Sequence, residues 1–237
     1  MKPRESSIMS SLVQRIARQA LVTFRQPPHS FPEEHSQLLG LLSQVRAADL
    51  RLAPPGSRPP PPRGAPPVTY MHICETDHFS MGVFLLQSGA CIPLHDHPGM
   101  HGLLKVVYGK LRVSCFDKLD RGPEPGAPRP SRPQVGALRR SVLRSSAEYA
   151  DDSQPCVLAP DRDNLHQIDA LDGPAAFVDV LAPPYDPDDG RDCHYFRVLQ
   201  GAELRESHER EVWLMEIAQP LSFWCGTEPY PGPEVRL

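Results

Sequence analysis

Two stretches near the start of the chain carry apolar residues at the spacing of one helix face. In the first stretch these residues are Ile8, Leu12, Ile16, Ala20 and Phe24. This period predicts an amphipathic helix, and Pro27-Pro28 ends it because proline has no backbone N–H to donate. A second helix is expected over 33–45, where Glu33-Glu34 suit the positive end of the helix dipole. We expect both helices to pack on the main body of the protein.

The pattern changes after residue 67, where short runs rich in β-branched and aromatic residues alternate with clusters of Gly, Pro and Asp. These runs are Val68–Cys74, Phe79–Leu86, Leu103–Val107, Lys110–Phe116, Val157–Leu158, Ala175–Leu181 and Val212–Ile217. Many short strands at this spacing predict an all-β sandwich or barrel. The Gly109-Lys110 pair lies between two of the runs, where we expect the turn of a tight hairpin.

Prolines mark the boundaries between the expected parts of the chain. The sequence has 29 of them, and they cluster, which indicates proline-rich linkers rather than proline within a core. We therefore divide the chain into a helical segment at 1–52, a proline-rich spacer at 53–67 and a barrel domain at 68–237. A second proline-rich stretch predicts a long exposed loop at 117–137, inserted in the barrel.

Composition and charge argue against several classes of function. The formal net charge is -4, so nothing indicates binding to nucleic acid or to a membrane surface, and no apolar run reaches the roughly 20 residues that cross a bilayer. The six cysteines contain no CxxC pair and no secretion signal precedes them, which favours reduced thiols and a cytosolic protein. A mitochondrial location stays open, because the Ser- and Arg-rich segment 7–25 also fits a transit peptide. We expect a monomer.

The residues that carry chemistry centre on a histidine pair. The segment from Gly89 to Gly99 contains His95 and His97, and side chains at i and i+2 of a strand point to the same face. If that face lines a barrel, both imidazoles can bind one metal ion together with a third ligand. His166 is the best candidate for that ligand, because it follows a turn-like stretch and opens an apolar run. Spacing alone leaves a chance surface pair as an open alternative.

The residues around these histidines resemble known metal-binding motifs. The segment that runs from Gly89 to Gly99 resembles the first motif of the cupin superfamily, whose fold is a double-stranded β-helix (jelly-roll) barrel. The stretch 160–166 resembles the second cupin motif, although the usual spacing is not kept. Most cupins carry a glutamate ligand four or five residues after the second histidine, where this chain has His101 and Gly102.

A site of three histidines without a carboxylate resembles that of the thiol dioxygenases, the cupin family that includes cysteamine dioxygenases and plant cysteine oxidases. The stretches that carry this resemblance are His95–Gly109, Phe177–Tyr185 and Asp192–Phe196. The likeness extends from about Val68 to the end of the chain. It implies a cupin barrel with one Fe(II) per chain held by His95, His97 and His166, and the two short N-terminal helices expected from the apolar period would pack on that barrel.

The resemblance also implies the reaction, in which both atoms of dioxygen are added to a free thiol to give a sulfinic acid. Three neutral imidazoles leave the full charge of the metal available to stabilise a thiolate. Three further positions on an octahedral ion are enough for a thiolate, an amine and dioxygen together. The implied substrates are cysteamine, which would give hypotaurine, and proteins or peptides with an N-terminal cysteine. Dioxygen as co-substrate would link oxygen level to protein degradation.

Four further residues belong to the expected site through the same resemblance. Asp179 would bind the substrate amine or a ligand histidine, and Tyr185 would donate a hydrogen bond to bound oxygen. Cys193 and Tyr195, at i and i+2, would form a thioether cross-link near the metal. Each has a plainer alternative: a solvent-facing strand position for Asp179, a partly buried packing position for Tyr185, and a buried cysteine beside a packing tyrosine for the pair.

Two other functions stay open. The chain could be a different three-histidine cupin oxygenase, such as one that cleaves a diketone, or a cupin that binds a metal or a sugar without catalysis. Retention of the three histidines together with Asp179 argues against the second of these. Imidazole ligands suit zinc, nickel and copper as well as iron, so the choice of iron rests on the family resemblance alone.

Overall fold

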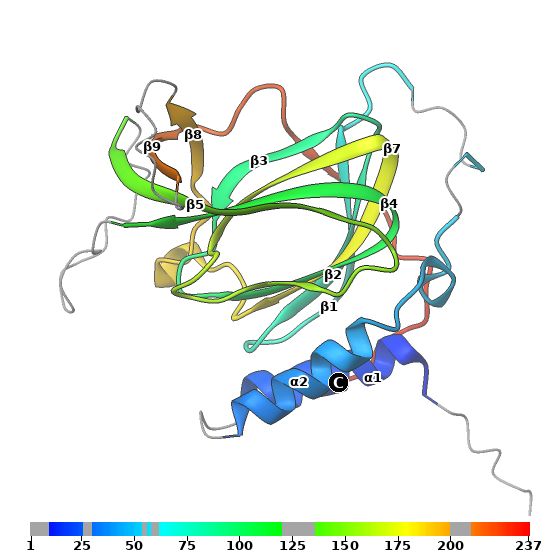
Figure 1. Cartoon of the computed structure of the whole chain (residues 1–237). Helices are drawn as coiled ribbons and strands as arrows, with labels where there is room; N and C mark the ends of the chain where they lie inside the picture. The colour runs from blue at the N-terminus through cyan, green and yellow to red at the C-terminus, as the bar shows by residue number, and fades with distance from the viewer. Residues whose placement is uncertain (1–9, 26–29, 54–55, 58–61, 120–135, 200–209) are drawn as a thin grey trace, which may run out of the picture.

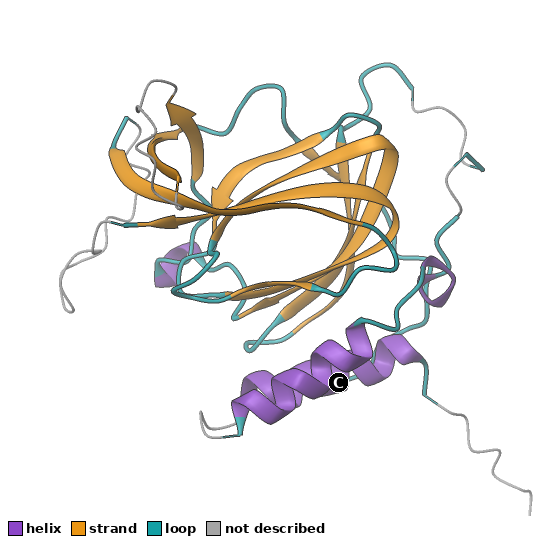
Figure 2. Cartoon of the chain, in the orientation of Figure 1, coloured by secondary structure: helices purple, strands orange, loops and turns teal. Residues whose placement is uncertain are grey.

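The computed structural model describes residues 10–25, 30–53, 56–57, 62–119, 136–199 and 210–237. Its helices are α1 (Leu12–Arg25), α2 (Phe31–Leu42) and the short 3-10 helices η1 (Ala47–Leu50) and η2 (Pro187–Asp189). Its strands are β1 (Val68–Glu75), β2 (Ser80–Leu86), β3 (Cys91–Asp96), β4 (His101–Lys118), β5 (Leu138–Tyr149), β6 (Cys156–Leu158), β7 (Leu165–Ala182), β8 (Tyr195–Leu199), β9 (Arg210–Ile217) and β10 (Cys225–Thr227). The strands form a barrel, and the helix pair lies against its outside (Figures 1 and 2).

Two long strands close the barrel. β4 and β7 pair antiparallel from His101 to Phe116 of β4. On its other side β7 pairs with β2 and β3, whereas β4 pairs with β5 and β6. The strands follow the order β10-β1-β2-β7-β3-β8-β9-β5-β4-β6, and the additional β4–β7 pairing closes the part of that order from β7 to β4 into a ring. The cupin-type all-β barrel expected from the sequence is therefore confirmed.

Gly109 bends β4 rather than ending it. The prediction of a hairpin turn at Gly109-Lys110 is wrong, because β4 runs through this pair without interruption. The register against β7 shifts on both sides of Tyr108, and Gly109 has a φ of 73°, which is costly for any residue with a Cβ. A similar irregularity lies in β7, where Asp172 and Gly173 have positive φ. Such bulges bend a strand and let both long strands follow the curved wall of the barrel.

The helix pair covers the outer face of the barrel wall. Ile16 of α1 and Leu38 of α2 are fully buried. They belong to one apolar cluster with Val83 of β2, Leu103 of β4 and Val178 of β7. Because burial of apolar surface stabilises by about 25 cal/mol per Å², this shared cluster holds the helices on the barrel. The expectation of two N-terminal helices packed on the barrel is confirmed.

The helices match the predicted pattern except at their ends. Ile8 and Pro27-Pro28 lie outside the described residues. α2 has Pro32 near its start and Glu33-Glu34 in its first turn, positions where proline and acidic side chains are favourable. Val45 lies beyond the end of α2 but is 1% exposed. The apolar repeat therefore predicted burial correctly at this position, whereas the predicted helix was too long.

The predicted apolar runs all correspond to strands, but some strands were not among the predicted runs. The expected runs at 68–74, 79–86, 157–158 and 212–217 correspond to β1, β2, β6 and β9, and the run at 175–181 is the second half of β7. None of the predicted runs matches β3, β5, β8 or β10, although the arguments on His95 and Tyr195 placed both residues on strands. β5 is rich in Arg and Ser, yet it is held between β4 and β9 on both sides, so neighbours rather than its own composition make it a strand.

The division into a helical segment, a spacer and a barrel domain stays a prediction. Much of the spacer at 53–67 and most of the loop at 117–137 lie outside the described residues. β4 extends to Lys118, so the first two residues of the predicted loop belong to that strand, whereas β5 begins at Leu138, directly after the loop as predicted. None of the helices in the described ranges is long and apolar enough to cross a membrane.

The interior of the barrel contains both an apolar cluster and buried polar side chains. Val106, Leu111, Val113, Ile168 and Phe177 are buried together in one cluster. The buried polar residues include His95, Asp96, His97 and His166. Polar groups are costly to bury unless they have partners, so this polar group marks the candidate site.

Candidate metal centre

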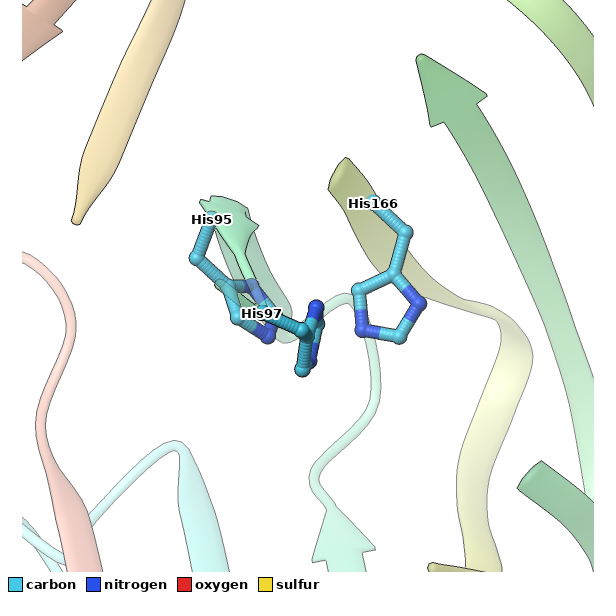
Figure 3. A group of neighbouring side chains, drawn as sticks. All are labelled: His95, His97 and His166. Atoms are coloured by element: carbon cyan, nitrogen blue, oxygen red, sulfur yellow. The ribbon is translucent and has the colours of Figure 1, made fainter. Parts of the chain in front are cut away.

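Three histidines from two neighbouring strands meet inside the barrel (Figure 3). His95 lies in β3, His97 follows the end of that strand, and His166 is the second residue of β7. His95 pairs with His166 across the β3–β7 ladder, and the three ring centroids are 4.6 to 4.7 Å apart. One nitrogen of each ring lies within 4.8 Å of a nitrogen of the other two. This spacing allows a single cation to contact all three rings.

Hydrogen bonds fix two of these rings from behind. Nδ1 of His95 lies 2.8 Å from the carbonyl oxygen of Pro93, and Nδ1 of His97 lies 2.9 Å from that of Asn164. A carbonyl oxygen only accepts, so each Nδ1 carries the proton and each Nε2 keeps a free lone pair. Nδ1 of His166 is buried and has no hydrogen-bond partner among the described residues.

Burial keeps all three imidazoles neutral. It lowers the pKa of His95, lowers the pKa of His97 to about 3 and lowers the pKa of His166 well below its ordinary value. Repulsion from neighbouring rings adds to the effect at His97 and His166. Neutral imidazole is the form that binds metals. Among the described residues this ligand group contains no carboxylate, so the donor set is three neutral nitrogens, which fits a divalent transition metal.

Asn164 joins the two strands that carry the histidines. Its side-chain Nδ2 donates to the carbonyl oxygens of His97 and Ala159 at 2.7 and 3.0 Å. Its Oδ1 accepts from the backbone N–H of His97 at 3.2 Å. The start of β7 is thereby tied to the segment after β3. Sequence reasoning missed this residue, and its only signal was a polar side chain two positions before His166.

Asp96, which lies between the histidine pair, links three parts of the site. Its carboxylate accepts from Nζ of Lys118 at 2.8 Å and from the backbone N–H and Nδ1 of His194 at 3.0 and 3.1 Å. Burial alone would raise the pKa of Asp96, but the His194 hydrogen bond and the Lys118 charge lower it to about 2. Its carbonyl oxygen accepts from the Tyr185 hydroxyl at 2.8 Å. Asp96, which sequence reasoning also missed, therefore fixes His194 and Tyr185 beside the histidines.

The rings face a cavity of about 450 Å³. The lining includes every residue that the sequence assigned to the site: His95, His97, His166, Asp179, Tyr185, Cys193 and Tyr195. Most of the remaining lining is apolar, with Phe84, Ile92, Phe177 and Phe223 among it. The sequence-derived residues are thus brought together, and the alternative of a solvent-facing strand position for Asp179 is wrong.

Asp179 is the acidic residue of this cavity. Burial raises the pKa of its carboxyl to about 7. No hydrogen bond or ion pair of its side chain is found among the described residues, so a ligand can reach the carboxylate. An acid in such surroundings gains most from a cation that enters the cavity with it. It can therefore bind an ammonium group close to the metal centre.

The thiol of Cys193 lies near two phenols, those of Tyr185 and Tyr195, and all three residues line the cavity. Burial raises the pKa of this thiol to about 12. Cys193 precedes β8, which begins at Tyr195. The argument that both side chains share one strand face is therefore wrong for Cys193, although both reach the cavity because the preceding loop directs the thiol inward.

Known proteins similar to this chain identify its family. The family model described as PCO_ADO matches residues 41–235. The chain belongs to the PCO_ADO family. The 2-aminoethanethiol dioxygenase of Mus musculus is 58% identical over 98% of this chain and 99% of the relative, and that of Homo sapiens is 54% identical over the same shares. Plant cysteine oxidase 1 of Arabidopsis thaliana is 33% identical over 80% of this chain and 67% of the relative.

The PCO_ADO match begins at the last two residues of α2 and includes the barrel and the cavity. All seven residues that the sequence assigned to the site lie within residues 41–235, and so do Asp96 and Asn164. The family that the histidine spacing resembled is thus the family to which the chain belongs. The three-histidine cluster, which is the group of possible metal ligands found among the described residues, lies within the matched region.

Proposed function

We propose that this chain is a non-haem iron dioxygenase that converts a free thiol to a sulfinic acid, with 2-aminoethanethiol (cysteamine) and N-terminal cysteine as its substrates. The observation that carries this proposal is the cluster of three neutral imidazoles without a carboxylate, in a cavity that also contains an acid. The similarity to 2-aminoethanethiol dioxygenases over 98% of the chain supports the choice of substrate.

His95, His97 and His166 are the proposed iron ligands. Imidazole suits several divalent metals, and the relatives named as dioxygenases favour iron among them. Bound Fe(II) would supply open coordination positions for a thiolate and dioxygen and lower the pKa of the thiol. The carbonyls of Pro93 and Asn164 hold two of the rings with Nε2 directed at the metal position.

Asp179 is the proposed site for the substrate amine. In both cysteamine and N-terminal cysteine, the ammonium group and the thiol are attached to neighbouring carbon atoms. A carboxylate and an ammonium in an apolar cavity stabilise each other more strongly than they would in water. Holding the amine at Asp179 would fix the thiol beside the histidines, which raises the effective concentration of the reacting groups.

Tyr185, Cys193 and Tyr195 are proposed to shape the cavity around bound oxygen. The Tyr185 hydroxyl donates to the Asp96 carbonyl, so it can donate to oxygen only if it leaves that partner. Cys193 and Tyr195 lie near each other in the lining of the same cavity, which supports the proposed thioether between them. Cross-linking would join Sγ of Cys193 to a ring carbon of Tyr195 and pass the two displaced hydrogen atoms, with their electrons, to dioxygen. Intact-mass spectrometry before and after turnover should therefore find a loss of about two daltons, and no loss in active enzyme would argue against the thioether.

The reduced state of the cysteines supports a cytosolic enzyme. All six are free thiols in the structure, as expected in a reducing compartment. A mitochondrial location remains the alternative. If proteins with an N-terminal cysteine are substrates, their oxidation would make their degradation depend on oxygen level. We propose that the enzyme acts as a monomer.

Oxygen uptake by the Fe(II)-loaded protein tests the function. Protein loaded without air should consume dioxygen when given cysteamine or a peptide with N-terminal cysteine, and the product should gain the mass of two oxygen atoms. Free cysteine and a diketone serve as comparison substrates. Uptake with the diketone alone would favour a diketone-cleaving oxygenase, and no uptake with any substrate would favour a cupin without catalysis.

A further inference from the structure

The segment between β9 and β10 carries large apolar side chains at the opening of the cavity. Gln219, Phe223 and Trp224 line the cavity, yet 44% of Trp224 remains exposed to solvent. A side chain that both lines a cavity and meets solvent lies at the rim. Leu221, within the same short segment, is 100% exposed. Exposed apolar side chains grouped in this way mark binding surfaces more often than isolated ones do.

Local hydrogen bonds hold this segment in one shape. The backbone N–H of Phe223 donates to the carbonyl of Pro220 at 3.0 Å, and Nε2 of Gln219 donates to the carbonyl of Phe223 at 3.0 Å. Immediately afterwards the chain enters β10, which pairs with β1. A surface that is ordered before binding loses little conformational entropy when a ligand packs on it.

The rim segment has no charge to offer a ligand. From Ala218 to Thr227 the sequence contains no Asp, Glu, Lys or Arg. Asp179 is the acidic side chain among the described residues that line the cavity, and it comes from β7 rather than from this segment. A charged side chain placed at the rim would lose water without gaining an ionic partner there. An apolar side chain would instead bury apolar surface of its own and of the rim segment.

The cavity also provides more room than a small aminothiol needs. Its volume of about 450 Å³ falls within the range that holds drug-sized ligands. If the thiol of an N-terminal cysteine lies at the histidines and its ammonium group at Asp179, the rest of the peptide must leave through the opening. The side chain of the following residue then passes the rim.

We propose that Trp224 and Leu221 form a subsite for the residue that follows the N-terminal cysteine of a peptide substrate, and that this subsite selects large apolar side chains. The inference rests on the proposed function. It adds a substrate preference that cysteamine, which has no second residue, cannot reveal.

Three peptides that differ only in the second residue test the subsite. Initial rates of oxygen uptake by the full-length Fe(II)-loaded protein are measured with Cys-Phe-Ala, Cys-Gly-Ala and Cys-Lys-Ala, each as the amide. We expect kcat/KM for the Phe peptide to exceed that for the Gly peptide roughly tenfold, as one apolar side chain in a pocket allows. The ratio of these two constants within one protein sample is independent of the fraction of active enzyme.

Three variants locate the effect. Trp224→Ala should reduce the Phe/Gly ratio to about one, and Leu221→Ser, at a fully exposed position that the fold does not need, should reduce it roughly threefold. Val22→Ser on α1, another exposed apolar position, should leave the ratio unchanged. The subsite is overturned if the wild-type ratio is near one, if Leu221→Ser keeps the full ratio, or if the Lys peptide is used as well as the Phe peptide. If no thiol is oxidised, the proposed function fails and the subsite fails with it.

Discussion

At the scale of single residues, the site contains two buried acids with different charge states. Burial raises the pKa of Asp179 and favours its protonated form, whereas hydrogen-bond and ionic partners keep Asp96 charged. Asp179 has its pKa raised to about 7 and no partner among the described residues. Asp96 is at least as buried, but contacts from His194 and Lys118 lower its pKa to about 2. The Asp179 carboxyl is therefore available to a ligand, whereas the Asp96 carboxylate holds Lys118 and His194 in place. The same residue type thus has two roles because its surroundings differ.

Asp179→Asn should stabilise the metal-free protein at neutral and higher pH. The folded protein holds the Asp179 proton up to about pH 7, because burial raises its pKa to about 7, whereas the unfolded chain releases that proton near the ordinary pKa of 3.8. Wild-type stability therefore falls as the pH rises through this window. The gain in melting temperature of the variant should be near zero below pH 4 and complete above pH 7. Scanning calorimetry across this range measures it, and a gain that does not change with pH would contradict the account.

Asp96→Asn should lower activity while iron is retained. The variant loses the charge that holds Lys118 and His194, so the segment with Cys193 and Tyr185 should shift relative to the histidines. We expect kcat to fall at least roughly tenfold and stability to drop by about 2 kcal/mol. Lys118→Met removes only the cation, so it should lower kcat and stability as well, but by smaller amounts. Wild-type kcat in Asp96→Asn, measured at one iron per chain, would rule out this positioning role.

The sequence revealed the ligands of the site but not the residues that hold them. His95 and His97 are detectable because their relation is local. His166 stood out because it follows a turn-like stretch and opens an apolar run, and the resemblance to a family supplied Asp179. Asp96 and Asn164 act through partners far away in the chain: Asp96 contacts His194 and Tyr185, and Asn164 contacts His97. No spacing rule reports such contacts, because only the folded chain brings these segments together.

At the scale of elements, β4 and β7 determine the shape of the site. Each carries an irregular point with positive φ, at Gly109 in β4 and at Gly173 in β7. Gly109 packs against the backbone at Pro174 and Ala175, so the two irregular points lie beside each other. From the sequence, glycine followed by lysine between two apolar runs predicted a turn, because a hairpin and a bulge both need a residue that adopts positive φ.

Gly109→Ala should be far more destabilising than Gly89→Ala. Both glycines have positive φ, 73° and 70°. A Cβ at Gly109 would meet the carbonyl oxygen of Pro174 and lie 2.7 Å from Cα of Ala175, whereas a Cβ at Gly89 meets nothing within 4 Å. We expect a loss of roughly 3 kcal/mol or more at Gly109 and about 1 kcal/mol at Gly89. Urea denaturation measures both, and equal losses would show that the close packing at the bulge is unimportant.

At the scale of the whole molecule, the two ends of the described chain are joined on the outside of the barrel. The side chain of Gln14 in α1 exchanges two hydrogen bonds with the backbone of Arg236, at 3.0 and 2.9 Å. The C-terminus lies beside the helix pair (Figure 1). The amphipathic pattern predicted the helices and the face they bury. It could not predict this contact, because a polar glutamine within a helix reads from sequence as a solvated residue.

Gln14→Ala should destabilise the protein although alanine favours helices. The change leaves the N–H and carbonyl of Arg236 without their partners in a partly buried place, which costs about 1–3 kcal/mol. Gln37→Ala on the exposed face of α2 is the matched control and should change stability by less than about 0.5 kcal/mol. Urea denaturation of the two variants compares them, and indistinguishable midpoints would mean that the C-terminal contact contributes nothing.

Iron content of single histidine variants tests the central claim most directly. After anaerobic Fe(II) loading and desalting, the wild type and His72→Ala, a control at an exposed histidine, should each contain about one iron per chain. His95→Ala, His97→Ala and His166→Ala should each retain less than roughly a tenth of that amount, because removing one of three ligands leaves too few to hold the ion. A folded His166→Ala protein that keeps its iron and oxidises cysteamine would contradict the account.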